Sequence, residues 1–136
     1  MGEDRILKNI IIIFFPLLMI VGCSEPINVN SLVKRNGIAY KVNSEKPFTG
    51  ESFELDKNGI ERWKCNFKNG KKHGNYILLY KNGQKKIEGK YKNNVRVGIW
   101  KTWYKNGQQK SIITFKDGEK IIRKEWNEKG QLLKND

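Results

Sequence analysis

Short runs of alternating apolar and polar residues fill the chain from residue 32 onward. Trp63, Cys65 and Phe67 alternate with polar residues, and the same spacing recurs near residues 87 and 111. Side chains alternate between the two faces of a strand, so this period of two predicts half-buried strands. No window holds apolar residues at helical spacing over three turns. We predict strands at residues 38–42, 50–55, 61–67, 74–80, 85–92, 98–104, 109–115, 121–126 and 131–133.

The predicted strands are separated by Asn-Gly or Asp-Gly pairs. Both residue types tolerate positive φ, which a two-residue hairpin turn requires at its two central positions. The pairs therefore predict consecutive antiparallel hairpins. They are Asn58-Gly59, Asn69-Gly70, Asn82-Gly83, Asn106-Gly107 and Asp117-Gly118.

A repeat of 24 residues organises these hairpins. Phe67, Tyr91 and Phe115 form one column at this period. Gly74 and Gly98 recur at the same spacing, and we interpret both as tight turns at the start of a strand. The alternative is a bulge or a close backbone approach at the strand entrance. Stacked repeats of this length bury a shared core between neighbours. We therefore predict an all-β fold, an elongated single antiparallel meander of stacked β-hairpins.

The N-terminal segment has the composition of a signal peptide. Residues 10–21 are twelve apolar residues, fewer than the roughly 20 that a membrane-spanning helix needs. The run ends in Val21-Gly22-Cys23, which resembles the lipobox of bacterial lipoproteins. The resemblance implies lipidation at Cys23 and anchoring in the bacterial cell envelope, at the outer membrane or cell surface. The alternative is an uncleaved N-terminal anchor with an incidental cysteine.

These observations divide the chain into three parts. Residues 1–22 are the expected lipoprotein signal peptide. Residues 23–31 combine the lipidated Cys23 with a short flexible tether, since they are polar and contain a proline. Residues 32–136 form the expected hairpin repeat domain.

The charge is strongly basic and unevenly placed. The chain has 27 basic and 14 acidic residues, and residues 62–116 contain fifteen of the former and only Glu88 of the latter. This block favours an anionic partner, or else reflects lysines that only solvate strand faces. Equivalent residues on every second strand lie about 10 Å apart. We expect two ladders of candidate binding cations on one face, Arg62, Lys86 and Lys110 in the first and Lys68, Lys92 and Lys116 in the second.

Aromatic residues add a second set of candidate binding residues. Tyr76 and Trp100 fall on one face of the predicted sheet and Trp103 on the other. A single sheet cannot bury both of its faces, so we expect some of these rings to be partly exposed beside lysines, as at protein interfaces. The alternative is that they only cover the sheet's own hairpins.

The sequence holds no recognisable catalytic constellation. His73 is the only histidine, and we interpret it as a turn residue. Cys65 shares the parity of Trp63 and Phe67, which favours a small core residue over a nucleophile. Acidic residues around Asn58-Gly59 read as a solvated edge, and the glycines follow hairpin spacing rather than a phosphate loop. We expect no enzyme activity, no metal and no cofactor.

Residues 67–83 carry the pattern aromatic-Lys-Asn-Gly-Lys-Lys-His-Gly, followed by Tyr80 and a second Asn-Gly. This resembles the MORN-repeat variant of the YwqK-type antitoxins. The chain departs from that pattern at residues 95–97 and at Ile122. The resemblance implies a twisted sheet of stacked hairpins and immunity against a toxin.

Arrays of this kind make binding surfaces more often than catalytic sites. We therefore expect an envelope lipoprotein that acts as a protein-binding repeat module, with a toxin as the partner that the resemblance implies. The alternative is a basic surface that binds anionic lipid headgroups or cell-wall polyanions. Nucleic acid is a weaker candidate, because export across the membrane argues against it.

Overall fold

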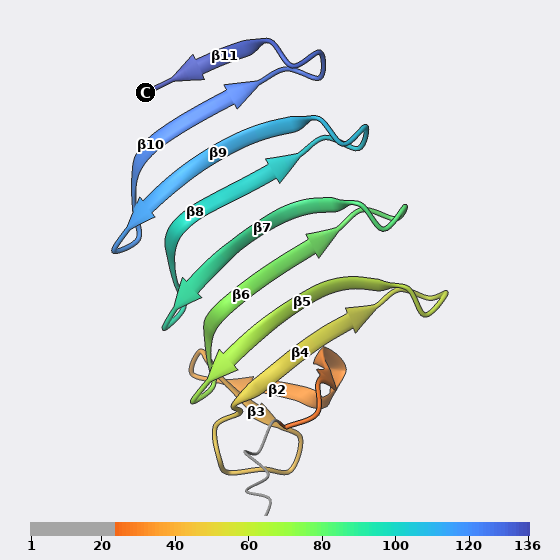
Figure 1. Ribbon diagram of the computed structural model, residues 1–136. Helices are drawn as coiled ribbons and strands as arrows, with labels where there is room; N and C mark the ends of the chain where they lie inside the picture. Colours follow the sequence, from red (N-terminus) through yellow and green to blue (C-terminus); the bar gives the residue numbers. More distant parts are fainter. Residues whose placement is uncertain (1–23) are drawn as a thin grey trace, which may run out of the picture.

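The computed structural model describes residues 24–136, so the predicted signal peptide and Cys23 lie outside the described residues. Apart from the short 3₁₀ turn η1 (Val29–Ser31), every element is a strand (Figure 1). The strands are β1 (Ile27–Asn28), β2 (Leu32–Arg35), β3 (Ile38–Lys41), β4 (Gly50–Leu55), β5 (Glu61–Lys68), β6 (Lys71–Leu79), β7 (Lys85–Lys92), β8 (Val95–Trp103), β9 (Gln109–Lys116), β10 (Glu119–Trp126) and β11 (Leu132–Asn135).

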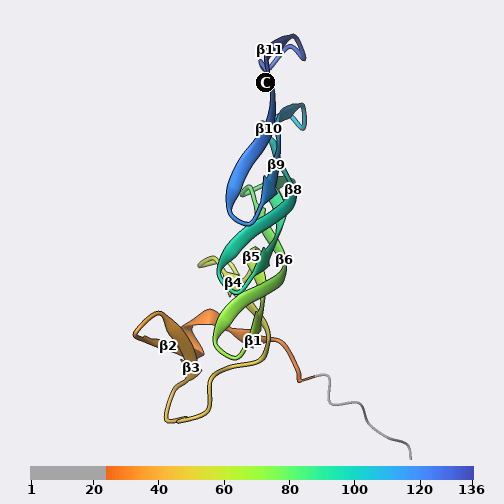
Figure 2. The same ribbon diagram turned by 90° about the vertical axis from the view of Figure 1, so that its left-hand side faces the viewer.

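The predicted all-β meander is confirmed. From β4 to β11 each strand pairs antiparallel with the next, within a nine-stranded sheet that begins with β1. The sheet is one layer thick and twists along its length (Figures 1 and 2). Each repeat contributes one hairpin to this stack.

The N-terminal end differs from the prediction in two ways. The strand expected at residues 38–42 does not join the meander, because β3 pairs with β2 in a separate hairpin. The tether expected at residues 23–31 is wrong for its described C-terminal part, since Ile27 and Asn28 pair in parallel with β4. No repeat copy precedes β4, so its outer edge would otherwise leave backbone groups unpaired. The sheet is therefore mixed rather than wholly antiparallel.

Two kinds of turn alternate along the stack. At one end of the strands, residues 69–70, 93–94 and 117–118 form two-residue turns with positive φ at both positions. This confirms the prediction at Asn69-Gly70 and Asp117-Gly118, and it extends to Asn93-Asn94, whose φ values are 51° and 69°. The sequence difference at residues 95–97 between neighbouring repeats thus leaves a regular hairpin.

At the opposite end of the strands the two-residue turn predicted for Asn58-Gly59, Asn82-Gly83 and Asn106-Gly107 is wrong. Only the glycine of each Asn-Gly pair there has positive φ. The N–H of Tyr80 donates to the carbonyl of Gln84 at 2.8 Å, and the N–H of Gly83 donates to the carbonyl of Tyr80 at 3.0 Å. These bonds define a type I turn that closes through a glycine bulge, which is the common three-residue alternative. The Asn82 Oδ1 accepts the Gln84 N–H at 3.2 Å, so the asparagine holds the loop rather than adopting positive φ.

Gly74 and Gly98 are not tight turns. Both lie inside strands, β6 and β8, with φ of 98° and 66°. The strand pairing shifts register beside each, which marks a β-bulge. His73 also lies within β6 rather than in a turn, and its Nδ1 is 3.3 Å from the Asn93 Oδ1 of the next hairpin.

The main core lies where the β2–β3 hairpin packs on the sheet. Ala39 and Phe48 meet Cys65 and Phe67 in one buried cluster, which confirms Cys65 as a small core residue. The N–H of Ala39 donates to the Gly70 carbonyl at 2.8 Å, and the N–H of Gly70 donates to the Phe48 carbonyl at 2.7 Å. These bonds fasten the hairpin and the segment that follows it to the Asn69-Gly70 turn between β5 and β6.

Candidate binding faces

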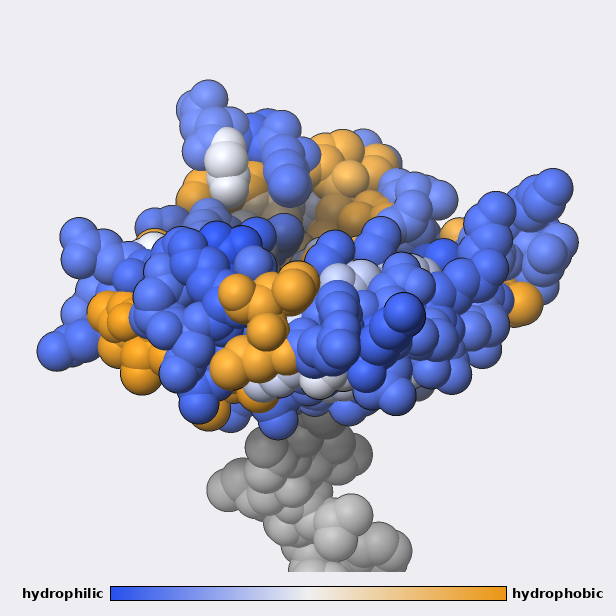
Figure 3. All heavy atoms as spheres, turned by 90° about the horizontal axis from the view of Figure 1, so that it is seen from above, coloured by the Kyte–Doolittle hydropathy of each residue, from blue (hydrophilic) through white to orange (hydrophobic). Residues whose placement is uncertain are grey.

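The strand register divides side chains between two faces. One is the aromatic face, which carries Trp63, Phe67, Tyr76, Tyr91, Trp100 and Phe115. The β2–β3 hairpin packs on this side, at one end of the sheet (Figure 2). We call the opposite side the open face, which carries Phe53, Ile77, Leu79, Ile99, Trp103, Ile112 and Trp126. Seen along the stack, apolar patches interrupt a largely hydrophilic surface (Figure 3).

The rings of the aromatic face form a continuous ladder across the hairpins. Neighbouring centroids are between 5.0 Å (Tyr91–Trp100) and 6.5 Å (Trp63–Phe67) apart. Most pairs are edge-to-face or tilted, and such pairs contribute about 0.5–1.5 kcal/mol each beyond their burial. The ladder gives this single layer a core of its own where no second layer covers it.

Two cations on the aromatic face were missed from the sequence. The Lys72 Nζ lies 5.1 Å from the Tyr91 ring centroid, and the Arg96 Cζ lies 4.7 Å from that of Trp100. Both stand opposite an aromatic in the hairpin register, Lys72 opposite Phe67 and Arg96 opposite Tyr91. The sequence did carry a signal for them, since a basic residue follows both Phe67 and Tyr91 of the 24-residue repeat by five positions. These side chains cover the ladder through cation–π contacts.

Trp100 is wrong as a candidate contact residue. Its side chain lies against Gly89 on the aromatic face and is 4% exposed. The indole Nε1 donates to the Lys90 carbonyl at 3.2 Å, which fixes the ring in place. Tyr76 is half-buried in the same ladder, and burial raises the pKa of its hydroxyl. Trp103 is half-buried on the open face and keeps part of its ring accessible.

The first predicted cation ladder lies on the open face. Lys86 and Lys110 are exposed, and their Nζ atoms lie 5.5 Å and 5.3 Å from the rings of Tyr80 and Tyr104. Arg62 is half-buried. The apolar residues Leu55, Leu79, Trp103 and Trp126 alternate with this ladder in strand order.

The second ladder lies at the opposite end of the strands, where β5, β7 and β9 end. Lys68, Lys92 and Lys116 are exposed beside the two-residue turns. The two predicted ladders are therefore separated by the length of the strands. They do not converge on one site.

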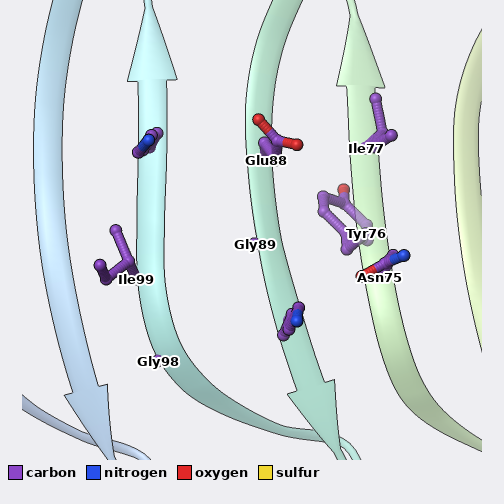
Figure 4. Close-up of a pocket in the computed structure, with 9 residues that line it drawn as sticks. Asn75, Tyr76, Ile77, Glu88, Gly89, Gly98 and Ile99 are labelled. Carbon is purple, nitrogen blue, oxygen red and sulfur yellow. The ribbon is translucent and has the colours of Figure 1, made fainter.

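A shallow groove of about 480 Å³ opens on the open face across β6, β7 and β8 (Figure 4). Ile77 and Ile99 provide its apolar surface, and Ile99 is 56% exposed. Gly89 and Gly98 also line the hollow, and a Cβ on Gly89 would point to the aromatic face, against Trp100. Lys101 also lines the groove.

Charge in this groove is only partly balanced. Glu88 stands beside Lys101 in the register, but its carboxylate pairs with Lys85 at 3.1 Å. Within the described residues Lys90 and Lys101 form no ion pair. The groove therefore offers an apolar surface with two free ammonium groups.

Between residues 24 and 136 the side chains form neither a three-ligand metal cluster nor a thiolate. No three His, Cys, Asp or Glu side chains there come together as metal ligands, and no helix is long and apolar enough to cross a membrane. Burial raises the pKa of the Cys65 thiol to about 11, although Lys72 and Lys34 act in the opposite direction. The thiol is thus protonated at neutral pH, and the thiolate is the nucleophilic form.

Comparison with protein families, curated proteins and solved structures found no match. The proposals below therefore rest on the two faces of the sheet and on the sequence pattern.

Proposed function

We propose that this chain is a lipid-anchored envelope protein that binds another protein through the open face of its hairpin array. The observation that carries the proposal is the open-face groove, where apolar side chains stand uncovered between unpaired lysines. No described element packs over this groove, whereas the other face has its own aromatic ladder and a hairpin. Apolar contacts ringed by charge are typical of protein interfaces.

The chemistry of the groove favours an acidic partner. Lys90 and Lys101 flank Ile77 and Ile99, and the whole chain has a formal charge of +13. Opposite charge on the partner would steer association and fix its orientation. Resemblance to the YwqK-type antitoxins supports a toxin as that partner, with binding as the means of neutralisation.

A photo-crosslinker at the groove tests the binding proposal in intact cells. We expect p-benzoylphenylalanine at Ile99 to give one stoichiometric protein adduct, since this side chain is central and exposed. Adding Lys101→Glu should reduce the yield about tenfold, as expected for loss of one favourable charge contact and gain of a repulsive one. Lys105→Glu, in an exposed turn outside the groove, is the matched control and should leave the adduct unchanged. No adduct, or one indifferent to Lys101→Glu, would refute the proposal.

The anchor is tested by metabolic labelling with palmitate. We expect Cys23→Ala to abolish incorporation, because lipobox-type processing attaches lipid at that cysteine. Cys65→Ala is the control and should label as the parent does, since Cys65 is buried. Undiminished labelling of the Cys23→Ala protein would exclude this anchor. Two or more acyl chains are needed for stable anchoring, so the Cys23→Ala protein should also leave the membrane fraction.

A second candidate function is binding of anionic lipid headgroups or cell-wall polyanions. The row of exposed lysines at the ends of β5, β7 and β9, which are Lys68, Lys92 and Lys116, favours binding of such polyanions. Each lysine near an anionic leaflet contributes about 1 kcal/mol. Such binding would fall steeply with salt and would not need Lys101, which separates it from the protein-binding proposal.

A further inference from the structure

A cleft lies between the β2–β3 hairpin and the aromatic face, on the side of the sheet away from the proposed protein-binding groove. It consists of two hollows, of about 330 Å³ and 270 Å³. Lys34, Phe67 and Lys72 line both hollows, so the two adjoin. Trp63 lines the larger hollow and Tyr91 the smaller. We call this the hairpin cleft.

The walls of the hairpin cleft are fixed by the core. Phe67 is 6% exposed and Ala39 is 1% exposed, so both are held by packing. The Ala39 N–H donates to the Gly70 carbonyl at 2.8 Å, which ties the hairpin wall to the sheet wall. A preformed concave site with apolar walls and few polar groups is typical of small-molecule sites.

Two lysines reach the cleft from opposite walls. Lys34 is the register partner of Ala39, whose side chain is buried against the sheet, so Lys34 faces the same way. Lys72 comes from the sheet, with its Nζ 5.4 Å from the Tyr76 centroid and 5.1 Å from that of Tyr91. Neither lysine forms an ion pair among the described residues.

The electrostatics agree with this placement. Both ammonium groups act to lower the pKa of the buried Cys65 thiol, which places them near the same point beneath the cleft. The one carboxylate that lines the cleft, Glu54, belongs to an exposed residue. Glu54 forms no ion pair with Lys34 or Lys72, so the cleft lining carries two positive charges against one negative charge. An anion between Lys34 and Lys72 would meet both ammonium groups beside aromatic rings.

We propose that the hairpin cleft binds a small amphipathic anion, with a flat aromatic or short aliphatic body and one carboxylate or sulfonate. The apolar body would lie against Trp63 and Phe67, and the anionic group between Lys34 and Lys72. This ligand site is separate from the open-face groove and does not depend on the protein-binding proposal. The volume of the larger hollow is at the lower end for ligand sites, which limits the ligand to a small molecule.

The test uses full-length lipoprotein in phosphatidylcholine nanodiscs and the fluorescent probe 1-anilinonaphthalene-8-sulfonate, with empty nanodiscs subtracted. We expect saturable binding at a single site. Lys34→Gln and the double variant Lys34→Gln/Lys72→Gln should weaken it about tenfold or more. The matched control is Lys81→Gln/Lys105→Gln, which removes two exposed lysines from turns distant from the cleft. This control should bind the probe as the parent does.

Competition separates charge recognition from apolar adsorption. Naphthalene-1-sulfonate should displace the probe, and neutral naphthalene-1-methanol should displace it far less. Lys34 is exposed, so Lys34→Gln tests the cleft even if the loss of Lys72 disturbs the aromatic face. Equal binding by Lys34→Gln and the parent, or equal competition by the neutral compound, would overturn the proposal. Failure of the Ile99 crosslink would have no bearing on it.

Discussion

Replacing Gly70 with alanine is expected to lower the free energy of unfolding by about 3 kcal/mol. Gly70 has φ of +73°, a conformation that costs other residues about 1 kcal/mol. An added Cβ would also lie 2.2 Å from the Ile38 Cγ2 and 2.7 Å from the Ala39 carbonyl oxygen. The second contact is with backbone and cannot be relieved by a rotamer change, so an overpacking cost of about 1–3 kcal/mol is added. Urea unfolding followed by tryptophan fluorescence measures the loss.

Gly37→Ala is the matched control for this steric term. Gly37 follows Asn36 in a two-residue turn of the same kind, with φ of +78°, and an added Cβ would meet nothing within 4 Å. We expect it to lose only the conformational term, about 1 kcal/mol. Equal losses at Gly70 and Gly37 would show that the hairpin is not packed on the Asn69-Gly70 turn as described. Gly70→Ala should also weaken probe binding in the hairpin cleft. Gly70 lines the cleft, and its carbonyl accepts the Ala39 N–H that holds the hairpin against the sheet.

Replacing Gly89 with alanine is expected to cost about 2 kcal/mol and to expose Trp100. Gly89 has no positive φ, so the cost arises from packing alone. Its added Cβ would lie 2.3 Å from the Cδ2 of Trp100, whose ring is buried and bonded to the Lys90 carbonyl. The indole must move outward, and overpacking of this kind costs about 1–3 kcal/mol. Tryptophan emission should shift to longer wavelength as the ring meets water.

A double-mutant cycle with Trp100→Leu isolates this contact. In the Trp100→Leu background the ring is absent, and we expect Gly89→Ala to be close to neutral. It could even stabilise the strand, because glycine is less favourable than alanine there by about 0.5–1 kcal/mol. If Gly89→Ala cost the same in both backgrounds, the stacking of Trp100 on Gly89 would not be the source of its effect.

The repeat explains why so much of the sheet was predictable. Phe67, Tyr91 and Phe115 occupy equivalent strand positions. Because side chains alternate along a strand, the position of each ring predicts which face of the sheet its neighbours occupy. Cys65 was assigned to the core on parity alone, and it is fully buried. Local rules suffice here because each strand pairs with its sequence neighbour.

Predictions failed where one residue type supports two geometries. Asn-Gly forms a two-residue turn at Asn69-Gly70 but part of a three-residue loop with a glycine bulge at Asn82-Gly83. The number of loop residues between the paired strands decides between the two geometries. Gly74 and Gly98 likewise fit either a tight turn or a bulge, and the less favoured bulge is the one that forms, inside the strands. Composition alone does not separate these cases.

The candidate sites were predicted less well than the fold. The cation ladder of Lys86 and Lys110 followed from the period, but Trp100 proved buried. Lys72 and Arg96 were missed because their contacts cross from one strand to rings on others. A face of a sheet is shared by many strands, so its exposure depends on what all of them contribute.

The sequence by itself determined the strands from β4 to β11, their order in the meander, the 24-residue period and the placement of positive charge along it, because these depend on neighbouring residues and on alternation. Only the tertiary structure decided what happens at the first edge and on the two faces. There β1 pairs with β4, and the β2–β3 hairpin packs on Phe67 to form the hairpin cleft. These contacts satisfy an exposed backbone edge and an exposed apolar surface, and both requirements arise only once the sheet has formed.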